Sequence, residues 1–362
     1  MVDGSGGVSG STFVVLGGRV ISPMMPLDRG GRCLDNRSME HINLATVDSV
    51  RVTSIVDNSA DLLAPVAGAA RDATYRGPRI VSPLMEDGEA FDGLVAEHGY
   101  SALVELRRGG RTTRVLYDAG LSPFGVRDNM RRLQIDPRDI EAAVMSHGHY
   151  DHTTGLQGVI EDLGRSGIPM VLHPDFWNRR RIRLEGTETV EIPTPSRTSI
   201  EGAGVQVVED RRPSLLFDAG LLVTGEVERT TGFERGMPHQ EAYRDGRWVD
   251  DGAVYDDQAA VVHVAGKGLV VLTGCGHAGV VNLLRHVRRL TGIERVHAII
   301  GGLHLTGKAF EPVIGPTVEA IAELRPDLIV PAHCTGWKAQ LALAQRLPDA
   351  VTPNAVGAVF EI

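Results

Sequence analysis

The part of the chain whose residue types could do chemistry is residues 146–155, which read SHGHYDHTTG. Three imidazoles, His147, His149 and His152, and the carboxylate of Asp151 fall within six residues. Neutral imidazole nitrogens and ionised carboxylate oxygens are donors for divalent metal ions, and grouping them is costly unless a cation holds them. The spacing therefore predicts a metal site. The alternative, a polar surface loop, leaves the scarcity of Lys, Glu and Ser in the stretch unexplained.

The segments on either side place these donors at a corner between a strand and a helix. Residues 140–145 are largely apolar and of strand length, and apolar residues recur at helical spacing over 156–163. In an extended segment the first two histidines, two residues apart, point the same way, whereas Asp151 and His152 follow as the chain turns. We therefore expect one pair of donors for each of two metal ions.

The H-x-H-x-D-H string that runs from His147 to His152 resembles the signature of the metallo-β-lactamase superfamily, whose members use it for a one- or two-metal hydrolytic centre. The resemblance implies an α/β fold, a four-layered αββα metallo-β-lactamase sandwich in a single domain over residues 49–362. It also implies a site built from loops at strand ends. Gly148 stands where the oxygen-reducing di-iron branch has a carboxylate, so redox chemistry is not expected.

Three more histidines follow apolar segments that we interpret as strands. His277 lies within GCGHAG at residues 274–279, where glycines on both sides let the backbone approach closely. His304 and His333 each follow a short apolar run, and we expect His304 to touch the substrate. The resemblance assigns the other two to metal: one ion would be held by His147, His149 and His277, and the other by Asp151, His152 and His333.

The sequence departs from the superfamily pattern at Cys275. In most of the superfamily a Gly-Asp pair ends this strand, and the Asp bridges two metals. Either Cys275 contributes a thiolate, or His277 supplies the missing donor and Cys275 is a small buried apolar residue. We prefer the second interpretation, because the bridging role suits a hard carboxylate if the metals are harder than zinc.

A second carboxylate, Asp118, ends the strand expected over residues 112–117. In the superfamily an Asp at this place supports the metal ligands, and a carboxylate there would fix a histidine tautomer. We therefore group Asp118 with Asp151 as catalytic candidates; the alternative is an ordinary helix cap. The same local pattern recurs at residues 215–220, where we interpret Asp218 as structural.

Other polar residues at expected strand ends are candidates for substrate binding. Asp57 and Asn58 follow the strand expected over 50–56, although a polar pair there is usually only a turn. Arg179 begins a run of four arginines within 179–183 that could clamp a phosphate through bidentate guanidinium contacts, with a solvated loop as the simpler alternative. The remaining two candidates are His173, before Pro174, and Glu226.

Composition limits the partners and the compartment. With 362 residues, 42% of them hydrophobic, the chain can bury one large core, and we favour one domain preceded by a Gly- and Ser-rich, poorly ordered extension over residues 1–48. The net charge of -9 disfavours a nucleic-acid footprint. Membrane-length apolar runs and a signal peptide are absent, and three cysteines suit a reducing compartment. We expect a soluble cytoplasmic protein, with homo-oligomer formation left open.

Several separated segments together resemble one branch of the superfamily, that of the dihydropterin-methyl ribofuranosylaminobenzene phosphate synthases. The most specific are GCGH at 274–277 and HCTG at 333–336. The resemblance implies a metal-dependent hydrolase or transferase acting on a small phosphorylated or heterocyclic, pterin-like substrate through a metal-activated water or a metal-polarised phosphate. Zinc is the expected metal for a His-rich centre, with manganese, iron or magnesium as alternatives. Two other functions stay open: a phosphodiesterase or nuclease of the RNA-processing branch, and a non-catalytic metal-binding module.

Overall fold

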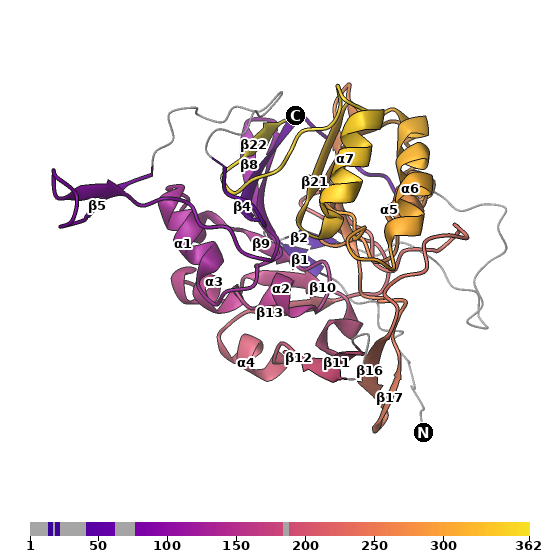
Figure 1. The fold of residues 1–362 in the computed structure, drawn as a ribbon, viewed down its shortest axis with the longest axis horizontal. Helices are drawn as coiled ribbons and strands as arrows, with labels where there is room; N and C mark the ends of the chain where they lie inside the picture. Colours follow the sequence, from indigo (N-terminus) through magenta and orange to yellow (C-terminus); the bar gives the residue numbers. More distant parts are fainter. Residues whose placement is uncertain (1–13, 17–18, 22–40, 62–76, 184–187) are drawn as a thin grey trace, which may run out of the picture.

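The computed structural model describes residues 14–16, 19–21, 41–61, 77–183 and 188–362. Within these residues the chain forms four layers, in which two β-sheets pack face to face and helices cover the two outer surfaces (Figure 1). The α/β sandwich predicted from the sequence is therefore confirmed.

The first sheet carries the strand before the histidine motif. In spatial order it consists of β13 (Gln206–Glu209), β10 (Pro169–Leu172), β9 (Ala142–Val144), β8 (Arg111–Tyr117), β7 (Ser101–Arg108), β4 (Ser49–Val56) and β22 (Val359–Glu361). Strands β13, β10, β9 and β8 are parallel, whereas β7 is antiparallel to both β8 and β4. Helices α1 (Gly125–Arg132) and α3 (Leu156–Asp162) pack on its outer face through buried Val126, Met130 and Val159.

The second sheet carries the other predicted metal histidines. It consists of β14 (Ser214–Leu216), β15 (Leu221–Val223), β18 (Ala259–Val264), β19 (Gly268–Thr273), β20 (Val296–Gly302) and β21 (Leu328–Ala332), with β3 (Thr46–Val47) beside β18. Strands β19, β20 and β21 are parallel. Helices α5 (Val280–Thr291), α6 (Glu311–Leu324) and α7 (Trp337–Arg346) cover its outer face (Figure 1).

Smaller elements surround the sandwich. A four-stranded sheet is formed by β12 (Thr189–Ile192), β11 (Arg180–Arg183), β16 (Gln240–Arg244) and β17 (Arg247–Asp250). Two hairpins are β1 (Val14–Leu16) with β2 (Arg19–Ile21), and β5 (Arg79–Val81) with β6 (Glu89–Phe91); the second projects away from the sandwich (Figure 1). The short helices are α2 (Tyr150–Thr153), α4 (Arg197–Gly202), and the 3-10 turns η1 (Pro137–Asp139), η2 (Pro174–Trp177) and η3 (His333–Thr335).

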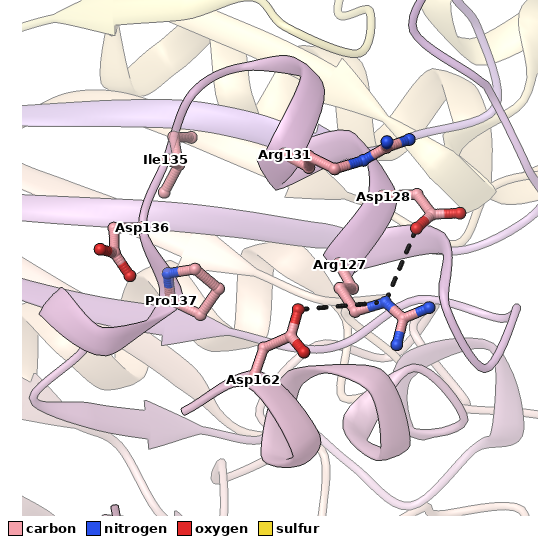
Figure 2. A pocket seen from close by; sticks show the side chains of 7 residues that line it. All are labelled: Arg127, Asp128, Arg131, Ile135, Asp136, Pro137 and Asp162. Carbon is pink, nitrogen blue, oxygen red and sulfur yellow. Dashed lines mark ion pairs between the residues drawn. The ribbon is translucent and has the colours of Figure 1, made fainter. Parts of the chain in front are cut away.

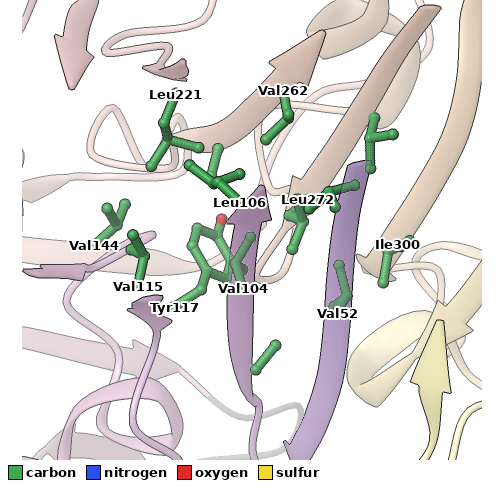
Figure 3. Packing of buried hydrophobic residues seen from close by; sticks show 14 of the residues in the cluster. Val52, Val104, Leu106, Val115, Tyr117, Val144, Leu221, Val262, Leu272 and Ile300 are labelled. Carbon is green, nitrogen blue, oxygen red and sulfur yellow. The ribbon is translucent and has the colours of Figure 1, made fainter. Parts of the chain in front are cut away.

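The main core lies between the two sheets. Val104 and Tyr117 of the first sheet pack with Val262, Leu272 and Ile300 of the second, and all five are essentially fully buried (Figure 3). Both faces of the central strands are covered, which explains why they read as continuous apolar runs and not as alternating ones. This packing fixes the strand ends of one sheet against those of the other.

The end of the predicted N-terminal extension contacts the second sheet. Most of the extension, residues 1–48, lies outside the described residues, but Leu44 and Val47 are buried and β3 pairs in parallel with β18. The domain boundary at residue 49 stays a prediction. None of the described helices has the length and apolar character needed to cross a lipid bilayer.

The structure predicts acid sensitivity at His286 on α5. Burial and the charge of Arg289 lower its pKa to about 4, whereas an unfolded histidine titrates near 6.5. The unfolded state thus binds more protons over this range, and His286 should cost the fold about 2 kcal/mol between pH 7 and pH 5. We expect His286→Gln to lose that much less stability over the same interval in urea unfolding. Equal losses in the two proteins would contradict the prediction.

Candidate metal centre

The residues selected from the sequence meet at one edge of the sandwich, because the strands that precede them all end there. Asp118 follows β8 and the histidine motif follows β9, while His333 follows β21. The two sheets touch at this edge: Nε2 of His152 lies 3.2 Å from Sγ of Cys275. Open α/β sheets commonly place their ligand sites at the carboxyl ends of strands.

Gly148 fixes the backbone of the histidine motif through a hydrogen bond and through close packing. Its N–H donates to Oδ2 of Asp256 at 2.8 Å, and a Cβ at this position would lie only 2.0 Å from the carbonyl oxygen of Phe176. Only glycine fits there without moving the backbone. His149 then caps the short helix α2, which carries Asp151 and His152.

Buried imidazoles form a compact cluster at this edge. The ring centroid of His147 lies 4.5 Å from that of His149, 4.3 Å from that of His152 and 4.8 Å from that of His277, and the rings of His152 and His333 are 4.9 Å apart. In three groups the possible donor atoms all lie within 4.8 Å of one another: His147, His149 and His277; His147, His152 and Cys275; and His98, Asp151 and His333. The structure therefore brings together all six residues that the sequence assigned to metal.

Asp118 sets the tautomers of two of these histidines. Its Oδ2 accepts hydrogen bonds from Nδ1 of His152 at 2.8 Å and from Oγ of Ser146 at 2.6 Å. Because the Ser146 hydroxyl donates to Asp118, its oxygen accepts from Nδ1 of His147 at 2.8 Å. His147 therefore keeps an unprotonated Nε2, which has no hydrogen-bond partner among the described residues. His152 turns its Nε2 toward the cluster, where a second proton or a cation can bind. These contacts match the supporting role expected of Asp118.

Polar residues orient two further histidines in the same way. Nε2 of His149 donates to Oε1 of Gln240 at 2.9 Å, which leaves its Nδ1 as the free donor atom. Nδ1 of His333 donates to Oδ1 of Asn58 at 3.2 Å, so its unprotonated Nε2 faces Oδ2 of Asp151 at 3.3 Å. A lone pair and a carboxylate at that separation repel each other unless a cation or a proton lies between them.

The electrostatics of the cluster favour a bound cation. Burial lowers the pKa of His147 well below its usual value and that of His149 to about 4, so both are neutral near pH 7. Burial alone would also lower the pKa of His152, but the carboxylates of Asp118 and Asp151 raise it to about 9. The centre therefore takes up positive charge, which a metal ion can supply in place of the proton.

Asp57 and Asn58 hold the loop of His333. Oδ1 of Asp57 accepts from the backbone N–H of His333 at 2.7 Å, and Nδ2 of Asn58 donates to the carbonyl oxygen of His333 at 3.1 Å. Asp57 is buried, whereas Asn58 is exposed beside the cluster. The structure thus places both beside the cluster, where they position the backbone of His333.

The other substrate candidates lie in different surroundings. Buried His173 donates from Nε2 to Oε1 of Glu226 at 3.1 Å, and Glu226 also accepts from Arg211. Arg179 is exposed, pairs with Glu191 and stacks on the four-stranded sheet. Within the described residues, its contacts are with that sheet and not with the histidines. His304 does lie at the cluster, with its ring centroid 4.2 Å from that of His277.

Arg180, next in the run, is a buried structural residue. Only 1% of its side chain is exposed, and it pairs with Asp251 at 2.9 Å and with Asp256 at 2.6 Å. Since Asp256 also anchors Gly148, this ion-pair network underlies the motif. The first three arginines of the run each have a carboxylate partner, because Arg181 pairs with Glu241. They therefore do not form the free phosphate clamp considered from the sequence.

Arg180 and its neighbour Arg179 form a matched pair for a stability test. Arg180→Met leaves buried Asp256 without its ion-pair partner, whereas Asp251 keeps Arg244, and we expect a loss of about 3 kcal/mol in the free energy of unfolding. Arg179→Met removes an exposed ion pair and should cost less than about 1 kcal/mol. Urea unfolding monitored by circular dichroism measures both values. Similar losses in the two variants would contradict the assignment.

Two residues at the site were missed by the sequence analysis. His98 is 56% exposed, and its Nε2 lies 3.6 Å from Oδ2 of Asp151, so it marks the open side of the cluster. Gln240 comes from β16 of the small sheet. Neither follows a strand of the main sandwich, which was the only signal used.

A surface pocket between α1 and α3 is separate from the cluster: Arg127 pairs there with Asp128 and Asp162 (Figure 2).

Comparison with known proteins identifies the family. A family model described as a beta-lactamase superfamily domain matches residues 113–230. The 7,8-dihydropterin-6-methyl-4-(beta-D-ribofuranosyl)-aminobenzene-5'-phosphate synthase of Methanocaldococcus jannaschii is 32% identical over 254 residues, which cover 68% of this chain and 83% of that protein. The chain belongs to the metallo-β-lactamase superfamily. Both the superfamily and the branch suggested by the sequence motifs are confirmed.

Other members of the superfamily agree with this assignment. An uncharacterized protein of the same archaeon is 29% identical over 263 residues, covering 72% of this chain and 93% of that protein. The crystal structure of Tm1679, described as a metal-dependent hydrolase of the beta-lactamase superfamily, has a TM-score of 0.64 at 23% identity. That match covers 86% of this chain and 99% of the other, and it shows a shared metallo-β-lactamase fold.

Proposed function

We propose that this protein is a two-metal hydrolase or transferase that acts on a small phosphorylated or heterocyclic substrate, with a pterin-like compound as the first candidate. The observation that carries the proposal is the cluster of buried imidazoles, several of whose nitrogens have no hydrogen-bond partner among the described residues, beside the carboxylate of Asp151. The substrate class rests on the name of the synthase from M. jannaschii.

The donor set fits two divalent ions. His147, His149 and His277 would hold one ion. Asp151, whose Oδ2 lies 4.0 Å from Nε2 of His152 and 3.3 Å from Nε2 of His333, would hold the other with these two histidines. Nε2 of His147 and both ring nitrogens of His277 are buried without a hydrogen-bond partner in the part of the chain that the structure describes, which suits metal ligands. Zinc fits a His-rich centre best, with manganese, iron or magnesium as alternatives. When bound, the ions would activate a water and polarise a carbonyl or phosphoryl oxygen.

The residues around the proposed centre orient its histidine rings and indicate the side on which the substrate enters. Asp118 orients His147 and His152 so that their Nε2 atoms face the proposed ions, and Asn58 does the same for His333. Exposed His98 lies beside Asp151, so we place the substrate entrance on this side, where His98 can exchange protons with solvent. The paired arginines and the net charge of -9 do not favour the nuclease alternative.

A substrate screen of metal-loaded protein tests the proposal. The compounds are phosphodiesters, lactones, β-lactams and pterin phosphates, the last with and without a ribofuranosyl-aminobenzene phosphate acceptor. We expect turnover of a pterin phosphate that chelator and His149→Ala abolish. His297→Ala, which removes a surface histidine paired with Asp327, should retain it.

The products then separate the two reaction types. Oxygen from isotopically labelled water appears in the product of hydrolysis, whereas a product joined to the acceptor identifies transfer. Stable metal binding without turnover of any compound would instead support the non-catalytic module.

A further inference from the structure

One buried thiol at the metal centre is unused by the function proposed above. Cys275 follows β19 and is 2% exposed, and its Sγ lies 3.2 Å from Nε2 of His152. It shares donor groups with His147 and His152, with His277 and His304, and with His333 and Cys334, each group within 4.8 Å. The sulfur is therefore close to histidines of both proposed ion sites.

The hydrogen-bond network leaves one position between three possible metal-donor atoms. Nδ1 of His152 donates to Asp118, so the ring turns its Nε2 toward Sγ of Cys275 at 3.2 Å. His147, on the other side, presents an unpartnered Nε2. A metal ion can occupy the position between the sulfur and these two nitrogens.

The spacing of these atoms suits tetrahedral coordination. Zinc binds thiolate sulfur at about 2.3 Å and imidazole nitrogen at about 2.1 Å, so adjacent donors lie about 3.6 Å apart. The separation of 3.2 Å between Cys275 and His152 is close to that value. A small relaxation on metal binding would complete the geometry.

Close packing fixes the backbone on either side of the sulfur. A Cβ at Gly274 would lie 2.1 Å from Oγ of Ser146 and 2.6 Å from Oδ2 of Asp118. Gly302, on the neighbouring strand, has no room for a side chain either, because a Cβ there would lie 2.3 Å from the carbonyl oxygen of Gly274. The backbone of Cys275 is thus held against the motif, which keeps its side chain beside His152.

We infer that Cys275 is a metal ligand, and that its thiolate bridges the ion held by His147, His149 and His277 and the ion held by Asp151, His152 and His333. This inference rests on the proposed two-metal centre, and it replaces our preference for Cys275 as a purely apolar residue. Binding exchanges the S–H bond for metal–sulfur bonds and releases one proton to solvent. A soft thiolate favours zinc or cobalt over manganese and magnesium.

Cobalt substitution tests the inference without an activity assay. The full-length protein and its single variants Cys33→Ser, Cys275→Ser and Cys334→Ser are loaded with Co²⁺, and the thiolate-to-cobalt charge-transfer band is recorded in the near ultraviolet. We expect the band in every protein except Cys275→Ser. Cys334, whose Sγ lies 3.5 Å from the carbonyl oxygen of Cys275, is the matched neighbour. A band that persists in Cys275→Ser, or that disappears only in Cys334→Ser, overturns the assignment.

A second measurement does not depend on the folding of Cys275→Ser. X-ray absorption of the zinc-loaded Cys33→Ser/Cys334→Ser protein, whose only thiol is Cys275, should show sulfur at about 2.3 Å from zinc. Zinc bound without sulfur overturns this inference and leaves the metal centre intact. Failure of the wild-type protein to bind any zinc or cobalt overturns the proposed function itself.

Discussion

His147→Ala is expected to remove one of two bound zinc ions and to halve the thermal stabilisation that zinc gives the protein. An ion present at 1,000 times its Kd stabilises a fold by about 4 kcal/mol, and a domain of this size gains about 2 °C in Tm per kcal/mol. Zinc should therefore raise the Tm of the wild-type protein by roughly 16 °C and that of the variant by roughly 8 °C. His147 is central because its ring contacts those of His149, His152 and His277.

Metal analysis and differential scanning calorimetry, with zinc and with chelator, measure these values. Comparing each protein with its own chelated form removes the cost of the cavity that the substitution leaves. His297→Ala is the control, since His297 lies outside the cluster beside Asp327. An unchanged zinc content and an unchanged zinc-dependent rise in Tm would show that the cluster is not a metal site.

Asp118→Asn should weaken both ion sites although it changes the size of the side chain little. The amide nitrogen would donate where the carboxylate oxygen now accepts, so the Ser146 hydroxyl would turn and donate to Nδ1 of His147. His147 and His152 would then carry their protons on Nε2, the atom that faces the metal. Disturbing such supporting contacts commonly lowers metal affinity 10- to 100-fold. With one ligand disturbed in each site, we expect an overall loss of about 10²- to 10⁴-fold.

The repeated local pattern supplies a matched control for this variant. Asp218 occupies the same place in LLFDAG that Asp118 occupies in VLYDAG, and both have a left-handed backbone, with φ of 53° and 57°. Asp218 is exposed and lies away from the histidines. Zinc competition titrations should show near wild-type affinity for Asp218→Asn. Equal weakening in both variants would mean that the effect comes from backbone conformation and not from histidine tautomers.

The parts of the fold that could be predicted are those that produce a recognisable pattern of apolar residues within one short stretch of sequence. Strands β4, β8 and β9 and the helix after the motif were expected within a few residues of their bounds, because burial imposes apolar runs and helical periodicity on them. The histidines of the motif followed from their spacing, whereas the assignment of His277 and His333 to metal came from the family resemblance. The support by Asp118 came from the family resemblance.

The parts that could not be predicted depend on partners distant in sequence. Arg179 and Arg180 are adjacent and chemically identical, yet one is exposed and the other is buried between Asp251 and Asp256. Gln240 reaches the centre only because the small sheet packs against the motif. The side-chain environment of Cys275 likewise emerged from the packing of one sheet against the other, which no local pattern specifies.

The division of the donors between the two sheets has a consequence for biosynthesis. Asp57 and His333, which are joined by a hydrogen bond in the folded protein, are 276 residues apart along the chain. As the ribosome makes the protein, the histidines of the motif emerge well before those that follow β19 and β21. With the two ion sites proposed here, the nascent chain would be an incomplete chelator until the segments after β19 and β21 had emerged.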